Sequence, residues 1–241
     1  MTRLDPNLPE EALIAAEAEA AIAANGARVQ RIEHAGRFYW VKHEEELTLR
    51  MRLQKGDPHR AFEAERNALH QLAEAGAPVP RVVAEGPDYF VTPDCGTPLQ
   101  GLFGRSAIHA FSAAAEGLAG FHAKGLSHGR PSVKDIAWDG QRVTFFDFER
   151  FAAKRNSFKG HVQDVVILLF SAFAETGRQT PETDALIDGY RSADPGGIWQ
   201  GAERLCRRLS WVDPLTRPIQ KMRRGREFRA IPLTLAAFGV L

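Results

Sequence analysis

The chain has 241 residues, of which 44% are hydrophobic and 25% are charged, and its formal net charge is +1. This composition is that of an ordinary globular protein with room for a substantial core. The nearly neutral charge does not indicate a nucleic-acid partner, and it does not indicate a global attraction to anionic membranes.

The first hundred residues predict a helix followed by a small sheet with two further helices. An Ala- and Glu-rich segment begins near Pro9 and ends at Asn25-Gly26, which is typical of a helix and its stop signal. Aromatic and β-branched residues then alternate around a turn at His34 to Arg37, which predicts a hairpin delivering Lys42. Helices are expected at 9–24, 44–55 and 59–75, and strands at 27–33, 38–41, 81–84 and 89–92.

The remainder of the chain predicts mostly helices. Apolar residues recur at helical spacing in residues 106–124 and 162–174, and an Asp139-Gly140 turn precedes a strand expected at 141–146. The tail predicts further helices that are broken at Pro195, Pro214, Pro218 and Pro232. Two aromatic residues of the tail, Trp211 and Phe228, are expected to pack inside. Because a Pro/Gly-rich connector near residues 93–104 separates the strands from the helices, the sequence predicts an α+β, two-lobed architecture.

The most informative segment runs from His128 to Glu149. Protein kinases carry a His-x-Asp-x-x-x-x-Asn loop followed by Asp-Phe-Gly. Here the loop Asp is replaced by Arg130, the Asn by Asp135 and the Gly by Glu149. With these motifs, residues 27–175 resemble the protein-kinase-like superfamily. They are most similar to its atypical bacterial branch, which includes lipopolysaccharide-core (Kdo-type) kinases and RIO-type kinases.

The resemblance implies a nucleotide site in a reduced N-lobe. Lys42 matches the strand lysine that holds nucleotide phosphates, and Glu65 matches its partner on the following helix, with Glu63 as the competing carboxylate. Residues 89–95 match the hinge strand beside an adenine, and Asp94 stands where many relatives carry an acid. The implied cofactors are ATP and Mg²⁺.

The same resemblance assigns roles in the mainly helical C-lobe. His128 is expected to brace the catalytic loop rather than to react. Asp147, at the end of a hydrophobic strand, and Asp135, twelve residues earlier, are the expected Mg²⁺ ligands, since carboxylate oxygens suit this hard cation. Asp164 resembles the helix acid that tethers the loop backbone.

Three features depart from the kinase pattern. Arg130 stands at the position of the catalytic base, and a guanidinium cannot accept a proton. No glycine-rich loop precedes Lys42, so phosphates would rely more on Lys42, Mg²⁺ and Arg28 or Arg31. Glu149 replaces Gly, which the atypical branch commonly shows.

Arg130 leaves two functional hypotheses open. It can bind an anionic acceptor, with Asp135 as metal ligand, base or both. The protein would then be an atypical ATP- and Mg²⁺-dependent phosphotransferase acting on a sugar hydroxyl of envelope lipopolysaccharide or on a protein hydroxyl. Alternatively, Arg130 pairs with an acid of the cleft and locks the loop, which gives a nucleotide- or partner-binding pseudokinase. Transfer of a nucleotidyl group has precedent among kinase-like folds, but no feature of this chain argues for it.

The expected organisation is an N-terminal helix (1–26), a kinase-like N-lobe (27–94) and a C-lobe with a basic tail (95–241). The tail is basic over residues 217–229, which a solvated helix or contact with an anionic surface would explain. No signal peptide is expected, because an apolar segment is missing from residues 1–6. Cys95 and Cys206 match no metal-binding spacing and are expected to be free thiols. The expected location is cytoplasmic, with peripheral attachment at the inner membrane as an option.

Overall fold

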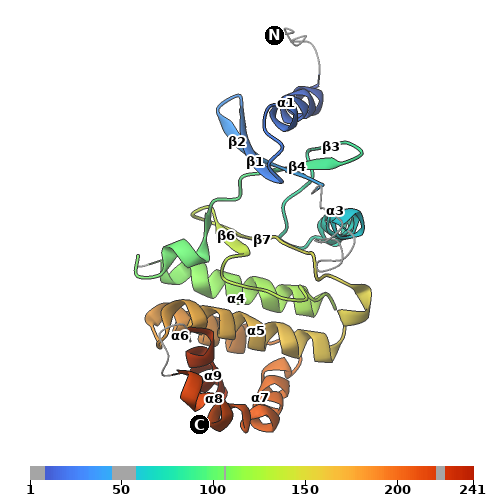
Figure 1. Ribbon diagram of the computed structural model, residues 1–241. Coiled ribbons are helices and arrows are strands. Elements are labelled where there is room, and N and C mark those ends of the chain that lie inside the picture. Colours follow the sequence, from blue (N-terminus) through green and yellow to red (C-terminus); the bar gives the residue numbers. More distant parts are fainter. Residues whose placement is uncertain (1–8, 45–57, 106, 221–225) are drawn as a thin grey trace. The chain divides into compact units, whose positions relative to one another are not determined.

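The chain is a mixed α+β protein (Figure 1). The structure, a computed structural model, describes residues 9–44, 58–105, 107–220 and 226–241. The chain forms two compact units, Met1–Cys95 and Gly96–Leu241, called here the N-terminal and the C-terminal unit.

The N-terminal unit is a twisted antiparallel sheet with helices, and its strands follow the order β1-β2-β4-β3. Its elements are α1 (Glu10–Ala24), β1 (Val29–His34), β2 (Arg37–His43), α3 (Pro58–Glu74), β3 (Ala84–Glu85) and β4 (Tyr89–Pro93). The predicted β1–β2 hairpin is present. Its turn, Ala35-Gly36, has positive φ at both residues (50° and 76°), as a two-residue turn between twisted strands requires.

One face of this sheet packs against α1. Alternate residues of β2, Tyr39 and Val41, are buried together with Ile14 and Ala18 of α1 and with Val91 of β4. Because side chains of a strand point to alternating faces, the intervening residues of β2 lie on the opposite face of the sheet. That face therefore carries Lys42.

One predicted strand of this unit is shorter than expected, and one predicted helix lies almost entirely outside the described residues. The strand expected at 81–84 is only two residues long, Ala84–Glu85. Its pairing is extended by single hydrogen bonds, from the N–H of Val83 to the C=O of Val91 and from the N–H of Gly86 to the C=O of Tyr89. The helix expected at 44–55 lies outside the described residues, except for Glu44.

The C-terminal unit consists of packed helices and a small antiparallel sheet of order β5-β6-β7. Its helices are α4 (Ile108–Ala123), α5 (Phe158–Thr176), α6 (Pro181–Ala193), α7 (Ile198–Leu209), α8 (Val212–Gln220) and α9 (Arg226–Ala237), with short 3-10 turns η1 (Leu99–Leu102) and η2 (Ala153–Arg155). Its strands are β5 (Thr97–Pro98), β6 (Ile136–Trp138) and β7 (Val143–Phe145). Helix α4 packs along α6, and α5 packs against α7 and α9 (Figure 1).

The strand predicted at 141–146 is shorter than expected. The carboxylate of Asp139 accepts hydrogen bonds from the N–H groups of Gln141 and Arg142, both at 2.7 Å. These bonds hold Gln141 and Arg142 in the turn, so the ladder starts only at Val143.

In the tail, three predicted helix breaks and one predicted burial are wrong. Pro195 lies between α6 and α7 as predicted, but Pro214 and Pro218 lie within α8 and Pro232 within α9. Pro214 occupies the first turn, where a helix needs no N–H donor. Helix α9 continues through Pro232, and its residues Ala230 and Leu235 are buried. Trp211, predicted to pack inside, is 59% exposed. Residues 221–225 of the basic stretch lie outside the described part of the chain.

Candidate functional site

Lys42 of β2 forms an ion pair with Glu65 of α3 in the N-terminal unit. Glu65 belongs to the inward stripe of α3, with Phe62, Leu69 and Leu72, and only 6% of its side chain is exposed. A buried carboxylate needs a partner of opposite charge or a set of hydrogen bonds, and the ammonium of Lys42 supplies it. The competing Glu63 faces another way and binds Arg66.

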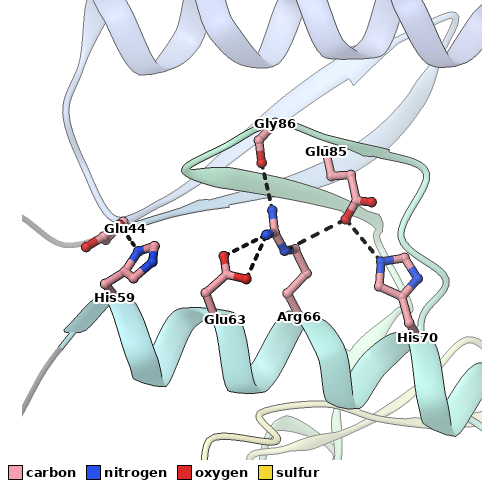
Figure 2. Close-up of polar contacts among 7 residues, drawn as sticks. All are labelled: Glu44, His59, Glu63, Arg66, His70, Glu85 and Gly86. Carbon is pink, nitrogen blue, oxygen red and sulfur yellow. Dashed lines mark hydrogen bonds and ion pairs between the residues drawn. The ribbon is translucent and has the colours of Figure 1, made fainter.

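A row of polar contacts attaches α3 to neighbouring segments of the same unit (Figure 2). Arg66 is at the centre: it donates to the C=O of Gly86 at 2.7 Å and to both carboxylate oxygens of Glu63 at 2.6 and 2.8 Å. His70 Nε2 lies 3.0 Å from Glu85 Oε2, near the end of the helix. The contacts with Gly86 and Glu85 attach α3, the helix that carries Glu65, to β3 and the residue after it.

Outside these contacts, α3 is attached at its first turn. His59 Nδ1 lies 2.9 Å from Oε2 of Glu44, the residue that follows β2 (Figure 2).

Asp94 follows β4, and its carboxylate lies 3.2 Å from the guanidinium of Arg31, which also covers the ring of Phe38 at 3.7 Å. Asp94 and Arg31, both considered at sequence level for nucleotide contacts, are therefore bound to each other.

In the C-terminal unit, the β6–β7 hairpin brings Asp135 and Asp147 together. Ile136 pairs with Phe145 in the register of the hairpin. The pairing continues one residue further, where the N–H of Phe146 donates to the C=O of Asp135 at 2.9 Å. Asp135 and Asp147 thus stand at adjoining positions of the two strand ends, although twelve residues separate them.

The charge of Asp147 acts on its neighbour Asp135. Burial, and next the charge of Asp147, raise the pKa of Asp135 to about 7, whereas the charges of Arg130 and Lys134 lower it. The buried Oδ1 of Asp147 has no hydrogen-bond partner among the described residues. Asp147 also has a φ of 63°, a left-handed conformation that costs a non-glycine residue about 1 kcal/mol or more. Such a strained, charged and unpaired arrangement is typical of a functional site.

The loop before Asp135 is tethered by Asp164 of α5. The carboxylate of Asp164 accepts hydrogen bonds from the backbone N–H of His128 at 2.7 Å and of Gly129 at 3.0 Å. The imidazole of His128 reaches the C=O of Phe146, 3.2 Å from Nε2. Burial lowers the pKa of His128, so the ring is neutral and its Nε2–H donates. His128 therefore links the loop to the residue that precedes Asp147.

Residues that were not considered for the site at sequence level support the same loop. Ser127 donates from its hydroxyl to the C=O of Arg155 at 2.6 Å, and its N–H donates to Asn156 at 2.9 Å. Arg155 donates to the C=O of Gly129 at 2.8 Å. The segment around η2 thus holds the first part of the loop through three hydrogen bonds. Arg155, Asn156 and Ser127 follow no recognisable spacing, so this role could not be predicted from a local pattern.

Arg130 is exposed, and its guanidinium charge acts on the acid pair by lowering the pKa of Asp135. Glu149 is also exposed, and its charge raises the same pKa. The carboxylates of Asp135 and Glu149 are therefore accompanied by the guanidinium of Arg130, which cannot take up a proton.

No helix among the described residues combines the length and apolarity needed to cross a bilayer.

The chain was compared with known proteins. No model of a known protein family matches the sequence. A protein of Haemophilus influenzae described as an uncharacterized protein is 31% identical over 199 residues, which cover 80% of this chain and 82% of that protein. The chain belongs to the same protein family as this H. influenzae protein.

Proposed function

We propose that the chain is an atypical phosphotransferase with a two-lobed protein-kinase-like fold, dependent on ATP and Mg²⁺. The observation that carries the proposal is the acid pair at the strand ends of the β6–β7 hairpin. Asp135 has a pKa of about 7, and Asp147 is held in a strained conformation with a buried oxygen that lacks a hydrogen-bond partner among the described residues. Divalent-cation binding would relieve both the mutual repulsion and the unpaired oxygen.

The donor set of this pair fits Mg²⁺, which prefers carboxylate oxygens. When bound there, the ion would neutralise charge on the β- and γ-phosphate oxygens of the nucleotide. Lys42, directed by Glu65, would hold phosphate oxygens, and Asp164 and His128 would keep the loop in place. Positioning and charge stabilisation are the main contributions to phosphoryl transfer. These residues and the metal ion would supply both contributions, even with Arg130 at the position of the base.

The resemblance to lipopolysaccharide-core and RIO-type kinases favours two acceptor classes, a sugar hydroxyl of the envelope glycolipid and a protein hydroxyl. Arg130, exposed beside the acid pair, is suited to an anionic group of either acceptor. Asp135, with its pKa near neutral pH, would also suit proton transfer in a state where it does not bind the metal.

A second candidate function is a pseudokinase that binds a nucleotide or a partner protein. Arg130 favours it, because this guanidinium occupies the position of the base and acts electrostatically on Asp135. If Arg130 neutralises the pair by itself, metal binding is weakened.

The test measures Mg²⁺-dependent ATP binding by calorimetry and ATP turnover by a coupled assay. The proteins compared are the wild type, Asp147→Ala, Arg130→Asp and the control Asp188→Ala, an exposed acid of α6. Turnover in the wild type and in the control, lost in Asp147→Ala by ~10²-fold or more, supports the phosphotransferase.

The remaining outcomes separate the alternatives. ATP binding without turnover in the wild type, with turnover gained in Arg130→Asp, supports the pseudokinase. Absence of any nucleotide binding by the wild type would contradict both nucleotide-based functions.

A further inference from the structure

A group of exposed apolar side chains lies at the junction of α7 and α8. The exposed fraction is 39% for Leu209, 59% for Trp211 and 67% for Leu215. Trp211 directly precedes α8, and Leu215 follows four residues later, so the two share a side of the helix. The opposite side contains the buried Asp213. The apolar side chains of Trp211 and Leu215 are thus exposed to solvent, whereas the acid Asp213 is buried.

Arginine side chains accompany this group. Helix α7 buries Ile198, Trp199, Ala202 and Cys206 on its inner side, which leaves Arg204, Arg207 and Arg208 exposed. The one acid between Arg204 and Pro218 is Asp213, which is already paired with Arg217 at 3.1 Å. From Arg204 to Pro218 the chain therefore presents exposed apolar side chains and exposed arginines, but no exposed acid.

The charge of the whole chain is divided along the sequence. From residue 204 to residue 229 there are nine Lys and Arg residues and two acids, whereas the rest of the chain holds 22 basic and 28 acidic residues. A basic segment in an otherwise acidic chain indicates an anionic partner for that segment. Leucine and tryptophan beside arginine are the side chains that enter the headgroup region of a bilayer, with Trp at the boundary and Arg at the phosphates.

We propose that Leu209, Trp211 and Leu215, with Arg207 and Arg208, form a membrane-docking surface for bilayers that contain anionic lipids. The apolar side chains enter the headgroup region, and the guanidinium groups bind lipid phosphates. This surface is distinct from the Lys42 and Asp147 sites and requires neither nucleotide nor phosphotransfer. It would bring the protein to the surface where a glycolipid acceptor lies.

The test is flotation of the full chain with vesicles of phosphatidylcholine alone or of phosphatidylcholine mixed with phosphatidylglycerol, without ATP or Mg²⁺. We expect binding to the mixed vesicles only, weakened by salt as exposed charges become screened. Trp211→Ala/Leu215→Ala should lower the partition coefficient about tenfold or more, and Arg207→Gln/Arg208→Gln should lower it about tenfold at low salt.

Matched controls change comparable side chains elsewhere. Leu241→Ser removes a leucine that is 60% exposed, and Arg142→Gln/Arg178→Gln removes two exposed arginines; neither should alter binding. Vesicle binding should also shift the tryptophan emission of the wild type to shorter wavelength, but not that of Trp211→Phe.

Three results would overturn the proposal. The first is absence of vesicle binding, and the second is binding that Trp211→Ala/Leu215→Ala leaves unchanged. The third is displacement of the protein from the vesicles by a single-stranded RNA. If the protein binds this RNA more tightly than the vesicles, and through the same residues, the surface is an RNA-binding site.

Discussion

The imidazole of His122 lies beside the carboxylate of Asp164 in the interior of the C-terminal unit, with 3.5 Å between Nε2 and Oδ2. On its other side, His122 Nδ1 is 2.5 Å from the hydroxyl of Tyr190. Burial raises the pKa of Tyr190, so the hydroxyl stays protonated and donates to Nδ1. The other ring nitrogen of His122, Nε2, faces the carboxylate of Asp164 without forming a hydrogen bond to it. Tyr190, His122 and Asp164 thus form a series that ends at the N–H groups of His128 and Gly129.

Replacing His122 by Phe should loosen this loop without removing the ring. The Phe ring can still stack on His161, whose ring centroid lies 4.5 Å from that of His122, but it cannot accept the hydrogen bond from Tyr190 or place a polar nitrogen beside Asp164. We expect faster amide hydrogen exchange at His128 and Gly129 and a loss of about 1–3 kcal/mol in the free energy of unfolding.

The matched control is His109→Phe, the same change at an exposed position of α4. It should alter neither quantity. Unchanged exchange in His122→Phe would show that Asp164 holds the loop without help from His122.

Arg66→Ala should release Glu65 from Lys42. Without the bonds from Arg66 to Gly86 and Glu63, α3 can rotate, and the ammonium of Lys42 becomes more accessible. We expect faster acetylation of Lys42 by an amine-reactive reagent, read by mass spectrometry, as in Glu65→Ala. The free energy of unfolding should fall by about 1–3 kcal/mol.

Arg60→Ala, an exposed arginine on the same helix, is the control and should leave the labelling of Lys42 unchanged. A loss of stability in Arg66→Ala with Lys42 labelled at the wild-type rate would mean that Arg66 supports the fold but does not direct Glu65.

Asp135 should make the protein less stable as the pH rises. Its pKa is raised from 3.8 to about 7 in the folded chain, so between these values the folded state binds more protons than the unfolded state. The free energy of unfolding therefore falls from pH 4 to pH 7 and levels off above it. The contribution is on the order of a few kcal/mol. Urea unfolding at several pH values should show this slope in the wild type and lose it in Asp135→Asn.

The turn acid Asp139 gives a contrast of opposite sign. Hydrogen bonds from the backbone N–H of Arg142, and then of Gln141, lower its pKa, so its contribution is present above its unfolded pKa and disappears as the pH falls through the folded value. A fall in the free energy of unfolding from pH 4 to pH 7 that persists in Asp135→Asn would show that a group other than Asp135 causes it.

Gly160→Ala should destabilise the loop support. A Cβ at this position of α5 would lie 1.8 Å from the C=O oxygen of Arg155 and 2.8 Å from Oγ of Ser127, so the segment around η2 would have to move. We expect a loss of more than about 2 kcal/mol in the free energy of unfolding, measured in urea. Gly120→Ala, in α4, meets nothing within 4 Å and should be neutral or stabilising by up to about 1 kcal/mol. Equal effects of the two changes would contradict this reading of Gly160.

Local features of the site were readable from the sequence because they rest on short-range patterns. The turn at Asp139-Gly140 and the strand that leads to Asp147 follow from such patterns, whereas the three-residue strand β6, whose pairing with β7 brings Asp135 beside Asp147, was not predicted. The stripe of Phe62, Leu69 and Leu72 likewise places Glu65 on the inner side of α3.

Other contacts depend on how distant segments pack, and no local pattern specifies them. Tyr190 and His122 are 68 residues apart and meet because α4 packs along α6. Arg66 meets the C=O of Gly86, a backbone group that any residue would supply. Pro232 is typical of a helix end, but the packing of α9 on α5 keeps the helix intact.

Helix α1 has a consequence for where this protein can be shortened. Its Ile14 and Ala18 cover the sheet, and Glu19 accepts a hydrogen bond from the hydroxyl of Tyr89 in β4 at 3.2 Å. A variant that starts at residue 27, where the resemblance to kinases begins, would keep Lys42, Glu65, Asp135 and Asp147. It would nevertheless expose Tyr39, Val41 and Val91 to water. The stretch of sequence that contains these candidate residues is thus shorter than the stretch that must fold with it, and a shortened variant should retain α1.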